Sequence, residues 1–173
     1  MKFSKNLIPK IFLILITNHI FIKTPRIESA ENIKIIYSVF SRTVSVDSLK
    51  NFVSNGNSST KLRRILNATG SSDDEIISVL NKDFEIPITI ASKLVYSEIG
   101  NIFLSRLSSI LHAPRAIDER TGMLALRSSV IQGLYTGNGK INLISFFESY
   151  PTKTVILNVN ALSKVMNLSL IHI

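Results

Sequence analysis

The chain has 173 residues, a formal net charge of +8 and no cysteine. Without cysteine it cannot be a disulfide scaffold, so an exported form must rely on apolar burial for its stability. Its basic residues are scattered among acids and form no block with stacking aromatic residues, which argues against nucleic-acid binding.

The N-terminus has the layout of a secretory signal peptide. Three lysines in the first ten residues precede a mainly apolar run at 11–22, and Ala30 is a small residue at the expected cleavage site. A membrane-spanning helix needs roughly 20 apolar residues, more than this run supplies. We therefore expect residues 1–30 to direct export, with only transient membrane contact. The alternative is an uncleaved N-terminal anchor.

Residues 31–173 are expected to form one domain with its own core. Runs rich in β-branched residues predict short strands at 33–37, 43–46 and 154–159. We expect the first two strands to be antiparallel. The third should pair with the first and so join the two ends of the domain.

A series of short helices is predicted between the second and third strands. Gly56 and Gly70 mark the ends of the first two helices, and a capping box from Ser72 to Glu75 begins the next one. The N-caps expected for the later helices are Thr89, Ser97, Asp118 and Asn142. A final helix is expected from about residue 160.

Apolar spacing of i, i+3 and i+4 predicts which helix faces are buried. The expected buried residues of the helix at 73–80 are Ile76, Ile77, Val79 and Leu80. Those of the helix after Ser97 are Ile99, Ile102, Phe103, Leu107, Ile110 and Leu111. Those of the helix after Asp118 are Met123, Leu126, Val130, Ile131 and Leu134. The fold class is therefore mainly α with a small antiparallel β element (α+β), made of several short helices and about three short strands.

The candidate catalytic residues are His112 and Ser109, three residues apart on one expected helix. Such a spacing would bring a hydroxyl close to an imidazole base. We favour the alternative, in which His112 interacts with the helix dipole and caps carbonyl groups before Pro114. The sequence contains no Gly-x-Ser-x-Gly, the turn that presents a serine nucleophile.

Arg127 is the candidate binding residue, because its guanidinium lies in the most apolar predicted helix and could hold a carboxylate. We favour the alternative in which its stem packs and its head reaches water or pairs with Asp118 or Glu119. Acidic residues elsewhere gather at helix starts, where the helix dipole accounts for them. Their spacing predicts no metal site, and we expect no cofactor.

Six segments follow one another in a recognisable order, at residues 35–38, 42–52, 94–100, 122–127, 142–151 and 155–159. In this order they resemble the N-terminal domain of a cyanobacterial family labelled alpha/beta hydrolase of unknown function. The resemblance implies a domain that follows a signal peptide and, in longer members, precedes a separate hydrolase domain. We expect only the first of these parts here, without a complete α/β-hydrolase sheet and with no catalytic residue to carry over.

The sequence leaves three interpretations of function open. The first, which we favour, is an exported, non-catalytic accessory domain that binds a hydrolase domain, a cell-envelope protein or itself. The second is an esterase-like or lipase-like hydrolase whose active site is incomplete or is supplied by a partner chain. The third is a remnant of a longer hydrolase gene. We expect the chain to have no enzymatic activity on its own.

Overall fold

The computed structural model describes residues 28–115, 118–162 and 164. Helices make up most of this part and accompany a four-stranded sheet and a two-stranded sheet, which confirms the predicted α+β class. In chain order the elements are β1 (Asn32–Tyr37), β2 (Phe40–Ser45), α2 (Val46–Asn55), α3 (Thr60–Thr69), α4 (Asp73–Leu80), β3 (Phe84–Glu85), α5 (Ile88–Val95), α6 (Glu98–Ile110), β4 (Leu111–His112), α7 (Glu119–Thr136), β5 (Lys140–Ile141), α8 (Leu143–Glu148) and β6 (Thr154–Asn158).

Two predictions fall mainly outside the described residues. One is the signal peptide, of which residues 1–27 are not described, and the other is the final helix, of which only the beginning is described. Residues 159–162 are helical, in agreement with the expected start of that helix. Among the helices that the structure describes, none is both long enough and apolar enough to cross a bilayer.

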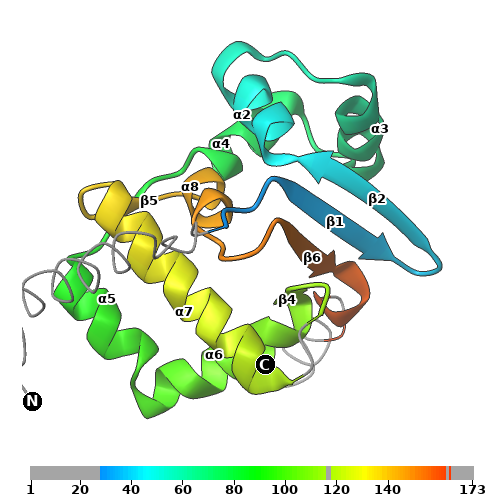
Figure 1. Cartoon of the computed structure of the whole chain (residues 1–173). Helices are drawn as coiled ribbons and strands as arrows, with labels where there is room; N and C mark the ends of the chain where they lie inside the picture. Colours follow the sequence, from blue (N-terminus) through cyan, green and yellow to red (C-terminus); the bar gives the residue numbers. More distant parts are fainter. Residues whose placement is uncertain (1–27, 116–117, 163, 165–173) are drawn as a thin grey trace, which may run out of the picture.

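The four-stranded sheet has the strand order β2-β1-β6-β4 (Figure 1). β1 and β2 are antiparallel as predicted, with Ile33 opposite Val44. β6 pairs with β1 as predicted, but in parallel, with Ile33 opposite Val155. The sheet is therefore mixed and not wholly antiparallel. Parallel neighbours need a long crossover connection, and helices α2 to α8 supply it between β2 and β6.

Most helix boundaries follow local capping chemistry. Gly56 and Gly70 adopt the left-handed conformation just after α2 and α3, with φ of 68° and 73°. Ser72 forms the predicted capping box with Glu75. The caps expected for three later helices are also confirmed, at Ser97, Asp118 and Asn142. The cap predicted at Thr89 is wrong, because α5 begins directly after a proline, whose fixed φ suits the start of a helix.

The core brings together side chains from the sheet and from helices α2, α3, α5, α6, α7 and α8. Its fully buried apolar and aromatic side chains are Phe52, Leu62, Leu126, Leu134, Tyr150 and Val155. Ala30, which precedes β1, is also buried. Val79 was expected on the buried side of α4, but it is exposed. No residue of this helix is fully buried.

Tyr150 lies just after α8, and its side chain is fully buried. Its ring meets the ring of Phe146 in an edge-to-face arrangement, with the centroids 6.2 Å apart. Its hydroxyl has no hydrogen-bond partner among the described residues. Burial raises the pKa of this hydroxyl from 10.0 to about 12.

We expect Tyr150→Phe to stabilise the fold by about 1 kcal/mol at pH 7, because an unpaired buried hydroxyl costs free energy. The gap between variant and wild type should widen from pH 10 to 12. The folded-state pKa of Tyr150 is raised, so the unfolded chain ionises first and the wild type loses stability as pH rises through this window. Urea unfolding of the variant and the wild type at pH 7, 10 and 12 measures these differences. A phenylalanine variant that is less stable at pH 7 would show that the hydroxyl is paired.

Candidate functional site

A groove lies between the end of α6, strand β4 and the start of α7. Its volume is about 350 Å³, and its lining residues are Ser105, Ser108, Ser109, His112, Asp118, Glu119 and Gly122. Both predicted catalytic candidates line it, together with two carboxylates. It therefore brings the residue types of a hydrolytic site to one place.

His112 does not lie on a helix, so the prediction that it shares one with Ser109 is wrong. α6 ends at Ile110, and the next two residues form β4, where His112 is opposite Ile156 of β6. In β4 the backbone of His112 is extended, and its hydrogen-bonding groups are satisfied by the sheet instead of by a last turn of α6. The imidazole Nδ1 lies 3.0 Å from the carbonyl oxygen of Ala113, so contact with a carbonyl before Pro114 is found without the helix dipole.

Two of the three serine hydroxyls that line the groove, those of Ser108 and Ser109, are engaged with the backbone of α6. Ser109 Oγ donates to the carbonyl oxygen of Arg106, and Ser108 Oγ to that of Ser105, both at 2.7 Å. Among the described residues, no hydrogen bond joins either hydroxyl to His112. A serine nucleophile requires a base within hydrogen-bond reach, and this arrangement does not provide one.

Asp118 serves as the N-cap of α7. Its carboxylate accepts a hydrogen bond from the backbone nitrogen of Thr121 at 2.6 Å. This backbone hydrogen bond lowers the pKa of Asp118 from its ordinary value. The carboxylate is therefore stabilised in its charged form at the positive end of the helix, as a capping group.

Arg127 connects α7 to the corner between α5 and α6. Its Nε donates to the carbonyl oxygen of Val95 at 2.9 Å, and its Nη2 donates to Asn101. The guanidinium also lies over the ring of Tyr96, 5.1 Å from the centroid. The expected pairing with Asp118 or Glu119 is therefore not found among the ion pairs of the described residues. These contacts give Arg127 a structural role at this corner.

α5, α6 and the corner between them carry six exposed apolar or aromatic side chains, which we call the α5–α6 apolar face. They are Ile90, Leu94, Tyr96, Ile99, Ile102 and Phe103. Ile99, Ile102 and Phe103 were expected to be buried, and that prediction is wrong. α6 instead buries Gly100, Leu104 and Ser108 on its other side, and near its end it buries Ile110, as predicted. The helix is apolar on two sides, so periodicity alone did not identify the covered one.

Small residues allow that opposite side to pack closely. A Cβ atom at Gly122 of α7 would lie 2.8 Å from the Cβ of Ser108, so the two helices meet at contact distance there. The pairing of α6 with α7 therefore uses Gly122 and Ser108, which sequence reasoning did not single out as packing residues.

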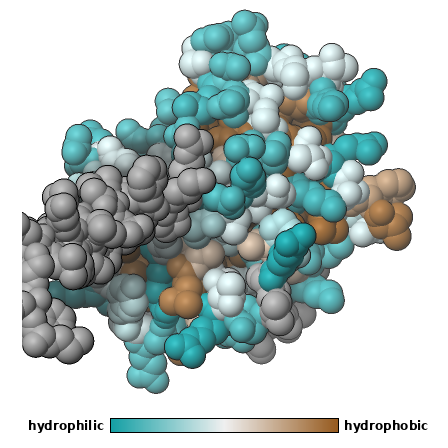
Figure 2. Space-filling view, in the orientation of Figure 1, coloured by the Kyte–Doolittle hydropathy of each residue, from teal (hydrophilic) through white to brown (hydrophobic). Residues whose placement is uncertain are grey.

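A second exposed apolar feature is the tip of the β1–β2 hairpin. Figure 2 shows brown side chains at the free end of this hairpin. Tyr37, Val39 and Phe40 are the exposed residues there. The backbone nitrogen of Ser38 donates to Asn160 Oδ1 at 3.0 Å, which ties the turn to the segment after β6. This feature has three residues, fewer than the α5–α6 apolar face.

The sequence model of the family described as alpha/beta hydrolase of unknown function matches residues 29–158. The chain belongs to this family. The match runs from before β1 to the end of β6, so the family domain includes both the groove and the α5–α6 apolar face. No curated protein and no solved structure matched the chain.

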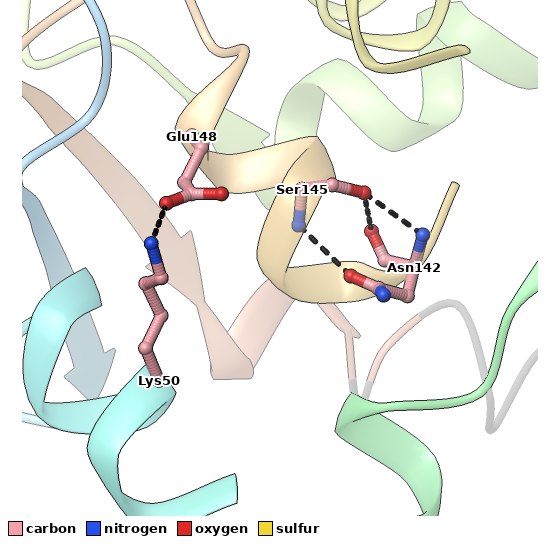
Figure 3. Close-up of polar contacts among 4 residues, drawn as sticks. All are labelled: Lys50, Asn142, Ser145 and Glu148. Atoms are coloured by element: carbon pink, nitrogen blue, oxygen red, sulfur yellow. Dashed lines mark hydrogen bonds and ion pairs between the residues drawn. The ribbon is translucent and has the colours of Figure 1, made fainter. Parts of the chain in front are cut away.

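In this member of the family, Glu148 has a structural partner. Its carboxylate accepts from Lys50 Nζ at 2.6 Å, which joins α8 to α2 (Figure 3). This hydrogen bond raises the pKa of Lys50. Both side chains are close to half exposed, so the pair adds little stability. Asn142 and Ser145 form the capping box of α8 beside it.

The hydrolase name of the family does not bring a catalytic residue to this chain, since the sequence lacks the serine-nucleophile turn. Within the residues that the structure describes, no three His, Asp or Glu side chains are grouped so as to hold a metal ion. The surface that sequence reasoning missed is the α5–α6 apolar face. The sequence indicated this surface only through apolar residues on two sides of α6.

Proposed function

We propose that this family member is an exported, non-catalytic interaction domain that binds its partner through the α5–α6 apolar face. The observation that carries the proposal is the exposure of this face, with Ile99 76% and Phe103 61% exposed. Large exposed apolar patches on soluble proteins mark interaction sites, and these side chains lie on and between two helices that contact each other. The signal-like N-terminus supports export, and the partner is a hydrolase domain, a cell-envelope protein or a second copy of this chain.

Non-catalytic function is supported by the state of the groove. The hydroxyls of Ser108 and Ser109 donate to backbone carbonyls, and Asp118 caps a helix. The alternative is a hydrolase whose site is completed by a partner chain. The observation that favours this alternative is that Ser109, His112 and Asp118 line one groove.

An esterase assay distinguishes the two functions. We expect the purified chain to hydrolyse short-chain p-nitrophenyl esters no faster than a heat-inactivated control, because no hydroxyl is paired with His112. His112→Ala and Ser109→Ala should leave this background unchanged. Hydrolysis above background that falls in both variants would instead establish the hydrolase alternative.

Binding through the apolar face is tested by affinity purification of the tagged chain from the compartment in which it resides. A specific partner should be recovered in fixed stoichiometry, and Phe103→Asp should abolish the recovery. Val79→Asp is the matched control, since Val79 is equally exposed, at 61%, but lies on α4. Equal recovery with both variants would exclude the α5–α6 apolar face as the docking surface.

A further inference from the structure

We propose that the α6 part of the apolar face binds a second copy of this chain, by antiparallel pairing of α6 with its symmetry mate about a two-fold axis at Ile102. The inference rests on the proposed function, because it names one partner for the same surface. The order of charges along the exposed side of α6 supports this inference.

On the exposed side of α6, apolar residues lie between two charged residues. Ile99, Ile102 and Phe103 are these apolar residues, at the i, i+3, i+4 spacing that places residues on one side of a helix. Glu98 lies four residues before Ile102, and Arg106 lies four residues after it. With a rise of about 1.5 Å per residue, each charge stands roughly 6 Å from Ile102 along the helix.

Neither charge is used within the described part of the chain. Glu98 and Arg106 are exposed, and neither takes part in the ion pairs found there. Those ion pairs are Lys50 with Glu148, Arg63 with Asp73, and Lys140 with Glu85. A charge available to a partner therefore lies on each side of the apolar residues of α6.

Antiparallel pairing makes these charges complementary. With Ile102 on the two-fold axis, Glu98 lies opposite Arg106 of the second copy, and Arg106 lies opposite Glu98 of that copy. A parallel arrangement would place like charges together and would be disfavoured. A two-fold interface is isologous, so one pattern supplies both halves, and the apolar centre packs between two identical ion pairs.

The neighbouring helix extends the apolar contact. Ile90 and Leu94 lie on the outer surface of α5, next to the corner that Arg127 fixes. A stable interface needs about 800 Å² per partner, more than the middle of one short helix offers. The side chains on α5 add to the surface of α6, so both helices contribute to the dimer.

Charge-reversal variants of the full chain, compared by analytical ultracentrifugation, test whether Glu98 and Arg106 pair across the dimer. We expect the wild type to dimerise. Glu98→Arg and Arg106→Glu should each raise the dissociation constant at least about tenfold, since each places like charges opposite one another twice per dimer. The double variant should recover the wild-type value. An equal mixture of the two single variants should form heterodimers, because their charges are again opposite.

Crosslinking tests the position of the two-fold axis. The chain has no cysteine, so Ile102→Cys introduces a single thiol. A short thiol-specific crosslinker should convert this variant to a covalent dimer. Val79→Cys, which places the single thiol on the exposed side of α4, should form no covalent dimer under the same conditions.

A monomeric wild type, or single charge variants that dimerise as well as the wild type, would overturn the inference. So would equal crosslinking of both cysteine variants. A monomeric Ile102→Cys variant whose thiol is protected from thiol reagents would also overturn it, because another part of the same chain would then cover the face. If the wild type is monomeric but the Phe103→Asp variant no longer recovers a co-purified partner, the proposed function stands and the second-copy inference fails.

Discussion

Phe52→Ala is expected to destabilise the domain by about 3–5 kcal/mol, the range for removing a buried phenylalanine side chain. Phe52 lies on α2, is 0% exposed and belongs to the core cluster with Val44, Leu62 and Val155. Its removal leaves a cavity where α2 meets the sheet. Domains of this size have a total stability of about 5–15 kcal/mol, so the variant should be close to unfolding at room temperature.

The measurement is urea unfolding followed by far-ultraviolet circular dichroism, with Phe40→Ala as the control. Phe40 has the same chemistry but is 65% exposed at the hairpin tip, so its variant should change the free energy of unfolding by no more than about 0.5 kcal/mol. Equal losses in the two variants would show that α2 is not seated in the core as the structure has it.

The parts of the fold that the sequence predicted depend on nearby residues. Ser72 and Glu75 form their capping box across three positions, and Gly56 and Gly70 end helices by their own backbone conformation. The pairing of the third strand with the first was also predicted, although its direction was not. Direction depends on how the intervening helices return the chain, which local sequence does not specify.

The parts of the site that the sequence did not predict depend on distant partners. Arg127 reaches Val95 and Asn101, which are 32 and 26 positions away, so no local spacing showed these contacts. His112 leaves the helix because it pairs with β6, near the end of the described chain. Ile102 was expected in the core because an apolar residue at helical spacing fits either a packed side or a binding side.

The corner between α5 and α6 holds the apolar face in place, and Gly100→Ala should disrupt it. A Cβ atom at Gly100 would collide with the carbonyl oxygen of Leu94 and would lie 3.1 Å from the Cα of Val95. These are backbone atoms, which cannot rotate away as a side chain can, so we expect a loss of about 3 kcal/mol.

Gly70→Ala is the matched control for this variant. Gly70 has open space around it but a φ of +73°, so alanine there costs only the strain of the left-handed conformation, about 1–2 kcal/mol. Thermal unfolding of the two variants separates crowding from strain. A loss at Gly100 no larger than at Gly70 would show that the corner can open. Because Arg127 binds Val95 at this corner, a shift there would also move α5 relative to α6 and alter the surface through which we propose the domain binds.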